Sequence, residues 1–320
     1  MNILEDLVNL ENIKTVVVIA GGIASFFAYV MIYRYNKYKL MKEQRESEPK
    51  QMSSLSDTKV QGGEESPPIS DGRRENVATA MKKPVVPPPP PPPKPKNQEV
   101  LTIKGVEYRF RLCPAGDFMM GDDGAQHKVT LSEFYMLETQ VTQAMWKSVT
   151  GGSNPSHWQG DRLPVEQVTW HDCQKYINEL NKLGVAPAGY RFSLPTEAQW
   201  EYACRAGTMT LYAGPNLDAM GWYNQNSGGR THEVGQKEPN AWGLYDMHGN
   251  VWEWCLDWYA TDYPGGSVTN PTGPDSGSSR VLRGGGWNRR ARYCRSAYRS
   301  NSDPAYRYDR CGVRLALVRE

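Results

Sequence analysis

The chain has 320 residues with 37 Lys or Arg against 35 Asp or Glu, so no large net charge marks nucleic acid or acidic lipid as a partner of the whole chain. Ten Trp and 18 Tyr against six Phe favour hydrogen-bonded loops and half-exposed surfaces over a dry core. Six scattered cysteines without a C-x-x-C pair argue against a zinc ribbon and favour free buried thiols, with disulfides as the alternative.

A charge-free apolar segment lies near the N-terminus, at residues 15–33. A helix of that length, at about 1.5 Å per residue, spans the hydrocarbon core of a bilayer. The short N-terminal tail before it, residues 1–14, is acidic rather than basic, and no small-residue cleavage site follows, which disfavours a cleavable signal peptide. The sequence therefore predicts a single-pass transmembrane helix.

Basic residues gather on the C-terminal side of this apolar segment. Five Lys or Arg residues fall within residues 34–45, whereas only Lys14 precedes the segment. Because cytoplasmic flanks accumulate Lys and Arg, the asymmetry predicts that the large C-terminal domain is cytoplasmic.

Residues 34–97 have the composition of a linker. Residues 46–80 are too polar to offset the entropy of ordering, which predicts disorder. Pro87 to Pro93 form an unbroken run that, at about 3.1 Å per residue in polyproline II, gives a stiff spacer of roughly 20 Å. The run could also dock in an aromatic-lined groove, but the spacer interpretation is favoured because nothing else in the sequence specifies such a partner.

Residues 98–320 have the pattern of one folded domain. Alternating stretches at 99–103 and 107–112 predict strands. Two helices are predicted by capping-box patterns, one beginning at Thr169 with apolar residues at helical spacing up to Leu180, the other beginning at Thr196. Between and after these helices, glycine-rich turns predict long loops.

Several motifs follow one another in a specific order along this domain. They are ETQVTQAMW at 138–146, LPVEQVTW at 163–170, LPTEAQWEYA at 194–203, GLYDMHGNVWEW at 243–254 and RVLRGGGW at 280–287. In this order they resemble the formylglycine-generating enzyme, or sulfatase-modifying factor, family. The resemblance implies an α+β, C-type-lectin-like fold with little regular secondary structure.

The same resemblance bears on catalysis. Oxidases of the family hold copper with two cysteines four residues apart, and here Cys294 lies near the second position while Arg289 occupies the first. A guanidinium cannot replace a thiolate ligand, which argues against copper. The related iron sulfoxide synthases use three histidines, and the five histidines of this chain show no close pairing, which argues against iron.

The resemblance also implies a structural calcium site. Its ligands would be the Asp246 side chain, the Gly249 and Val251 carbonyls and the Glu253 carboxylate, all oxygen donors that a hard cation prefers. The alternative is that Asp246 caps a turn while Glu253 pairs with an arginine.

The C-terminal tail is dense in Asn, Arg, Tyr, Ser and Asp between fixed-looking stretches. It is similar to the variable region of target proteins of diversity-generating retroelements, several of which use this fold. Tyr supplies rigid contact area, Ser and Asn adaptable hydrogen bonds, and Arg planar charged contacts. We call the predicted ligand-contacting residues the contact set: Asn288, Arg289, Arg290, Tyr293, Tyr298, Ser300, Asn301, Ser302, Asp303, Tyr306, Tyr308, Asp309 and Arg310.

The composition of this tail also fits roles without variation. Ordinary members of the family have tails rich in Asn, Arg and Tyr as well. A nucleic-acid surface is disfavoured by the acidic Asp303 and Asp309. Four arginines are instead predicted to make internal ion pairs and carbonyl contacts, namely Arg283, Arg295, Arg299 and Arg314.

Together these features predict a membrane-anchored protein that binds a protein or peptide ligand through the contact set. One alternative is an oxidoreductase acting on a thiol or peptide substrate with Cys294 as its reactive group. Another is a structural envelope component.

Overall fold

The computed structural model describes residues 97–122 and 124–320. The predicted tail, the membrane helix and the linker up to residue 96 lie outside the described residues. Within the described part of the chain, every helix is too short or too polar to span a bilayer.

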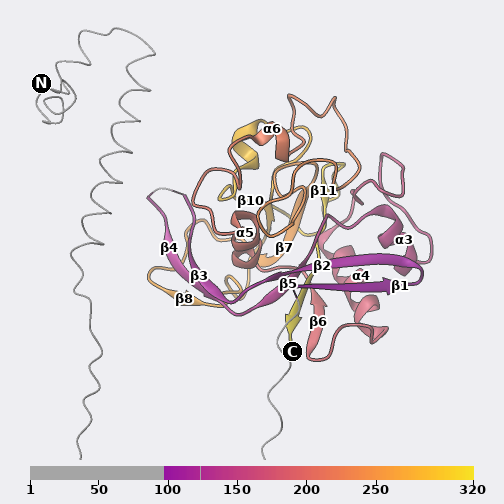
Figure 1. Ribbon diagram of the computed structural model, residues 1–320, viewed down its shortest axis with the longest axis horizontal. Helices are drawn as coiled ribbons and strands as arrows, with labels where there is room; N and C mark the ends of the chain where they lie inside the picture. Colours follow the sequence, from indigo (N-terminus) through magenta and orange to yellow (C-terminus); the bar gives the residue numbers. More distant parts are fainter. Residues whose placement is uncertain (1–96, 123) are drawn as a thin grey trace, which may run out of the picture. The chain divides into compact units, whose positions relative to one another are not determined.

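A five-stranded antiparallel sheet forms one side of the domain (Figure 1). Strand β12 pairs with β5 on one side and with β6 on the other, so it is an interior strand of this sheet. In spatial order the strands are β1 (Gln98–Ile103), β2 (Val106–Cys113), β5 (Phe134–Leu137), β12 (Ala316–Arg319) and β6 (Tyr190–Ser193).

Two smaller sheets complete the β-structure. The first has the order β10 (Ser300–Ser302), β9 (Arg280–Arg283), β7 (Trp252–Trp258) and β11 (Cys311–Gly312). The second has the order β3 (Gly116–Met120), β4 (His127–Leu131) and β8 (Val268–Thr269). The β11–β7 and β4–β8 pairs are parallel, and each brings together segments that are far apart in the sequence.

Few helices accompany these sheets. They are α3 (Gln143–Thr150), α4 (Trp170–Lys182), α5 (Glu197–Arg205), the single turn α6 (Leu217–Met220) and a 3₁₀ turn at Ala291–Cys294. The two predicted helices are confirmed, with Thr169 and Thr196 as N-caps of reciprocal capping boxes. Helix α3 was not predicted. The mainly β architecture with long loops is the one that the resemblance implied.

The core has two main apolar clusters. One lies under α3 and α4 and includes Trp254 and Phe192, and the other lies around α5 and includes Trp200. Helix α5 contacts β3 as well as β7 and β9, so it joins the two smaller sheets (Figure 1). Apolar burial of this kind supplies most of the favourable free energy of folding.

Buried ion pairs surround α5. The fully buried Arg283 guanidinium pairs with Glu201, which also accepts from Arg205 at 2.8 Å, while Arg299 pairs with Glu197 at 2.6 Å. Arg295 pairs with Asp122 and Arg314 with Glu253, each at 2.9 Å. All four arginines therefore form ion pairs within the domain, of which the Arg295–Asp122 pair is partly exposed.

Candidate functional site

The C-terminal segment contains a buried frame and a set of exposed or half-buried side chains. The frame comprises Arg283, Cys294, Cys311, Gly312 and Arg314, all of which are buried. No member of the contact set is buried, and Tyr306 is the most exposed large apolar side chain among them at 56%. Four members of the contact set are exposed and the other nine are half-buried, whereas the five frame residues are buried.

Glycines allow the frame to pack tightly. Gly285 adopts φ +79°, and a Cβ atom there would lie 2.5 Å from the Cys294 sulfur. A Cβ atom at Gly312 would collide with the Val165 carbonyl. Only glycine combines this backbone conformation with so close an approach, which explains the glycine-rich stretch before the contact set.

The first half of the contact set is an arginine-rich aromatic patch. The rings of Tyr293 and Tyr298 meet edge to face at 4.9 Å. The Arg292 guanidinium, which donates to the Tyr293 hydroxyl, lowers the pKa of that group, and the charges of Arg289 and Arg290 lower it further. Rigid aromatic surface beside several guanidinium groups suits an acidic or hydrogen-bond-accepting ligand.

The second half of the contact set is fixed against α4. Arg307 pairs with Asp172 in the first turn of α4 at 2.8 Å, and the Gln167 N–H donates to the Tyr308 carbonyl at 3.0 Å. The rings of Tyr306 and Tyr308 meet edge to face at 6.1 Å. These two contacts fix the backbone at residues 307 and 308, while the neighbouring Tyr306 side chain is exposed.

Trp158 and Glu166, which lie next to the contact set, were not predicted as site residues. The Trp158 ring meets the Trp287 ring edge to face at 5.0 Å, and the Trp287 indole N–H donates to the Asp309 carbonyl at 3.0 Å. Glu166 is fully buried, and one of its carboxylate oxygens accepts from the His157 and Trp158 N–H groups. Burial, with a smaller contribution from the Asp309 charge, raises the pKa of Glu166 to about 7. The available sequence signal was an acidic residue inside the apolar run 163–168.

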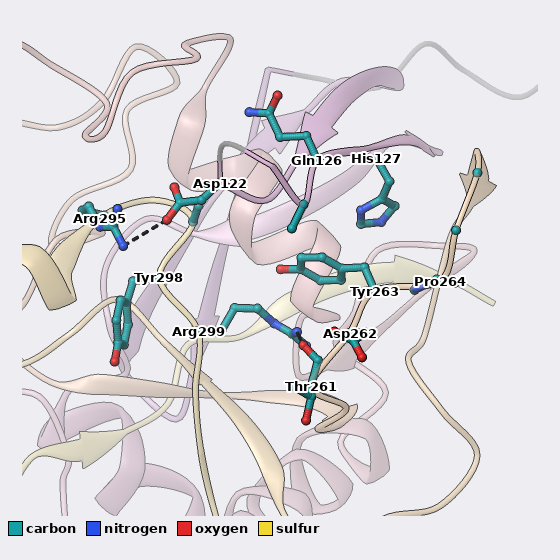
Figure 2. A pocket seen from close by; sticks show the side chains of 14 residues that line it. Asp122, Gln126, His127, Thr261, Asp262, Tyr263, Pro264, Arg295, Tyr298 and Arg299 are labelled. Carbon is teal, nitrogen blue, oxygen red and sulfur yellow. Dashed lines mark hydrogen bonds and ion pairs between the residues drawn. The ribbon is translucent and has the colours of Figure 1, made fainter.

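A cavity of about 510 Å³ opens beside the patch (Figure 2). Tyr298 and Arg299 from the C-terminal segment line it, together with Asp122, His127 and Tyr263. The Arg299 guanidinium lies 4.1 Å from the centre of the Tyr263 ring. Tyr298 is the one contact-set residue in this lining, so the other members of the set lie outside the cavity.

Cys294 lies below the surface rather than on it. Its side chain has no exposed area, and burial raises the pKa of the thiol to about 12. The neutral thiol therefore dominates near pH 7, and the thiolate is the form that acts as nucleophile or metal ligand. Among the described residues, no three His, Cys, Asp or Glu side chains converge as metal ligands.

The four residues predicted to bind calcium do converge, around the side-chain nitrogen of Gln140. Gln140 Nε2 lies 3.4 Å from the Asp246 carbonyl, 3.2 Å from the Gly249 carbonyl, 3.0 Å from the Val251 carbonyl and 2.9 Å from Glu253 Oε1. Left-handed backbone at Asp246 (φ +58°) turns this loop tightly. Asp246 faces the centre through its main-chain carbonyl, whereas the prediction used its carboxylate.

The interactions of the alternative interpretation are also present. One Asp246 carboxylate oxygen accepts from the Gly235 N–H at 2.8 Å, and Arg314 donates to both oxygens of Glu253 at 2.9 Å. Burial raises the pKa of Asp246 to about 6. Three carbonyls and a carboxylate still form an oxygen-rich centre of the chemistry that calcium uses, so the donor set fits the ion.

The family model of the Sulfatase-modifying factor enzyme 1-like domain matches residues 96–319. The chain is 33% identical to Chaperone protein LppX of Paenibacillus barcinonensis, over 50% of this chain and 71% of the relative. It is 32% identical to the Formylglycine-generating enzyme of Mus musculus, over 55% of this chain and 52% of that enzyme. The match thus spans about half the length of that enzyme.

Two solved structures share the fold. Treponema denticola variable protein 1 superposes with a TM-score of 0.65 and 34% identity, covering 69% of this chain and 99% of the other. PvdO from Pseudomonas aeruginosa superposes with a TM-score of 0.62 and 27% identity, covering 70% and 99%.

Proposed function

The chain belongs to the sulfatase-modifying factor enzyme 1-like domain family, and on that premise we propose that its domain is a ligand-binding module rather than an oxidase. The ligand is a protein or peptide, and it is contacted by the contact set. The similarity to a variable protein of the same fold supports this function.

One observation carries the proposal: every contact-set residue keeps exposed surface, while the frame residues between and beside them are buried. Side chains can therefore change on this surface without changing the core. Tyrosines at Tyr293, Tyr298 and Tyr306 supply large contact area at low entropic cost.

A displayed random-peptide library, panned on the immobilised full chain, tests the binding function. Peptides recovered in this way should lose at least about tenfold in affinity when Tyr298 and Tyr306 are each replaced by Ala, since aromatic anchors of interfaces contribute about 1.4 kcal/mol or more. Val100→Ser is the control, because Val100 is an exposed apolar residue of β1 outside the contact set. Equal loss in all three variants would refute a site at the contact set.

Diversification by a retroelement is a further part of the proposal. Sequencing the 3′ end of the gene across many cells of one clonal population tests it. Substitutions confined to the contact set, beside a reverse-transcriptase gene and a template repeat, would establish it. An invariant tail would instead indicate a fixed ligand.

The oxidoreductase alternative requires a reactive Cys294. The Cys294 thiol is fully buried with a raised pKa, and Arg289 occupies the sequence position of the partner cysteine, and both features oppose that role. Cys294→Ser should therefore leave ligand binding unchanged, whereas loss of all function in this variant would favour the enzyme.

We also propose that the oxygens around Gln140 hold a structural calcium ion, which would stabilise the turn at 246–253. Calcium would supply positive charge at the centre of three carbonyls and the Glu253 carboxylate. Chelation should lower the melting temperature of the full chain, and an unchanged melting curve would remove this site.

Membrane anchoring through residues 15–33, with the domain in the cytoplasm, completes the proposal. The free state of all six cysteines supports a reducing compartment. Alkaline carbonate extraction of cell membranes should leave the full chain in the pellet and release a variant without residues 15–33. Protease protection of the domain in intact spheroplasts would agree with a cytoplasmic domain, and cleavage would reverse the orientation.

A further inference from the structure

The Gln140 side-chain amide has more acceptors around its nitrogen than it has hydrogens to donate, and its oxygen has no donor. Its nitrogen carries two hydrogens but faces four oxygens within 3.4 Å. Its own oxygen is buried without a hydrogen-bond partner among the described residues. Gln140 has no exposed surface, so bulk water cannot correct either deficit.

A second acceptor, on a residue whose carbonyl faces this amide, is also unpaired. Asp246 Oδ1 is buried without a partner in the described structure, although the other oxygen of that carboxylate accepts from Gly235. A buried cluster of polar atoms normally satisfies nearly all of its members. Here the cluster has an excess of oxygen acceptors, and a cation would correct that imbalance.

Rotation of the Gln140 amide by half a turn would exchange its nitrogen and oxygen. The oxygen would then lie among the Asp246, Gly249, Val251 and Glu253 oxygens, an arrangement that is repulsive without a cation and favourable with one. Five protein oxygens would then face the centre, and water could complete the six to eight ligands that calcium takes.

We infer that Gln140 acts in two states, as the internal donor that closes the site when no cation is bound and as an oxygen ligand when one is bound. This inference rests on the proposed calcium site and assigns its regulation. Arg314 already donates to both oxygens of Glu253, which weakens the attraction of the site for calcium.

Calorimetric titration of the purified full chain with calcium, and melting curves with calcium or with chelator, test the inference. Gln140→Met removes both the donor and the ligand, so it should lower the melting temperature in chelator and weaken calcium binding about tenfold. Gln140→Glu removes the donor but keeps an oxygen and adds a charge. It should also melt lower in chelator, yet bind calcium about tenfold more tightly.

Gln143→Met is the matched control, because Gln143 is an equally buried amide whose atoms bond to Trp158, Pro164, Asn154 and Gly160 instead. It should lower the melting temperature equally with and without calcium and leave the dissociation constant unchanged. Calcium binding of wild-type strength in Gln140→Met would overturn the role of Gln140. No calcium response in the wild-type chain would overturn the calcium site itself, and the two failures are thereby distinguished.

Discussion

The frame and the contact set alternate along the C-terminal segment, but they differ in burial and in the number of polar contacts that their side chains make. Frame residues such as Arg283 and Arg314 are enclosed by charged partners and carbonyls, and their side chains have no exposed surface. Contact-set residues such as Tyr306 and Asn301 extend outward from held backbone. One short segment can therefore combine buried positions, where substitution is costly, with surface positions where side chains can change at little cost in stability.

Removal of a frame arginine is the strongest test of this contrast. Arg314→Met should destabilise the domain by about 3–5 kcal/mol, since it leaves the buried Glu253 without its partner. It also removes donors from the Leu137 and Tyr245 carbonyls. Urea unfolding followed by tryptophan fluorescence measures the change, and a loss under about 1 kcal/mol would contradict the assigned frame.

The next largest effect is expected at the turn before the contact set. Gly285→Ala should cost at least about 1–2 kcal/mol, because a Cβ atom is disfavoured at φ +79° and would approach the Cys294 sulfur. Gly265→Ala is the control, since a Cβ atom there meets nothing. Equal midpoints of urea unfolding for the two variants would show that the turn is not tightly packed.

Glu166, which is buried close to the contact set, makes the stability of the domain depend on pH. Its carboxyl has a pKa raised to about 7 in the folded chain, so its contribution to stability is complete below its ordinary pKa and is lost as the pH rises through 7. Glu166→Gln stays neutral, and its melting temperature should fall less than that of the wild-type chain between pH 5 and pH 8. Parallel curves would exclude this assignment. Asp257, whose pKa burial raises to about 7, should preserve part of the slope.

Cysteine reactivity distinguishes the frame from an active site. All six cysteines are free and buried, so a thiol reagent should label almost none in the native chain and all six after denaturation. Rapid labelling of Cys294 alone under native conditions would contradict its place in the frame.

The smallest stability effect belongs to the contact set. Asn301→Ser combined with Tyr306→Ser should change the free energy of unfolding by no more than about 0.5 kcal/mol, because both side chains are exposed. A larger loss, measured by the same urea titration, would show that the two parts are not separable.

Features with local causes could be predicted from the sequence. The helices after Thr169 and Thr196 follow from capping boxes within four residues, and the internal arginines follow from their place in the ordered motifs. Helix α3 was missed because Thr142 caps its start without a capping box, since the residue three positions later is Met145 rather than an acceptor side chain. Gln140 was missed because its partners lie 106 to 113 residues away in the sequence, so nothing local identifies them. Glu166 was missed because its hydrogen-bond partners, Ser156, His157 and Trp158, lie eight to ten residues earlier in an irregular loop that no sequence pattern predicts.

Strand β12 lies between β5 and β6, although it follows the whole contact set in the sequence. A gene copy that acquires a stop codon or a frameshift within residues 288–310 yields a chain without β12. Such a chain leaves two strand edges unpaired and its apolar core open, a state that proteases and chaperones recognise. Because β12 follows the contact set, only chains translated in the correct frame through residues 316–319 can complete the five-stranded sheet.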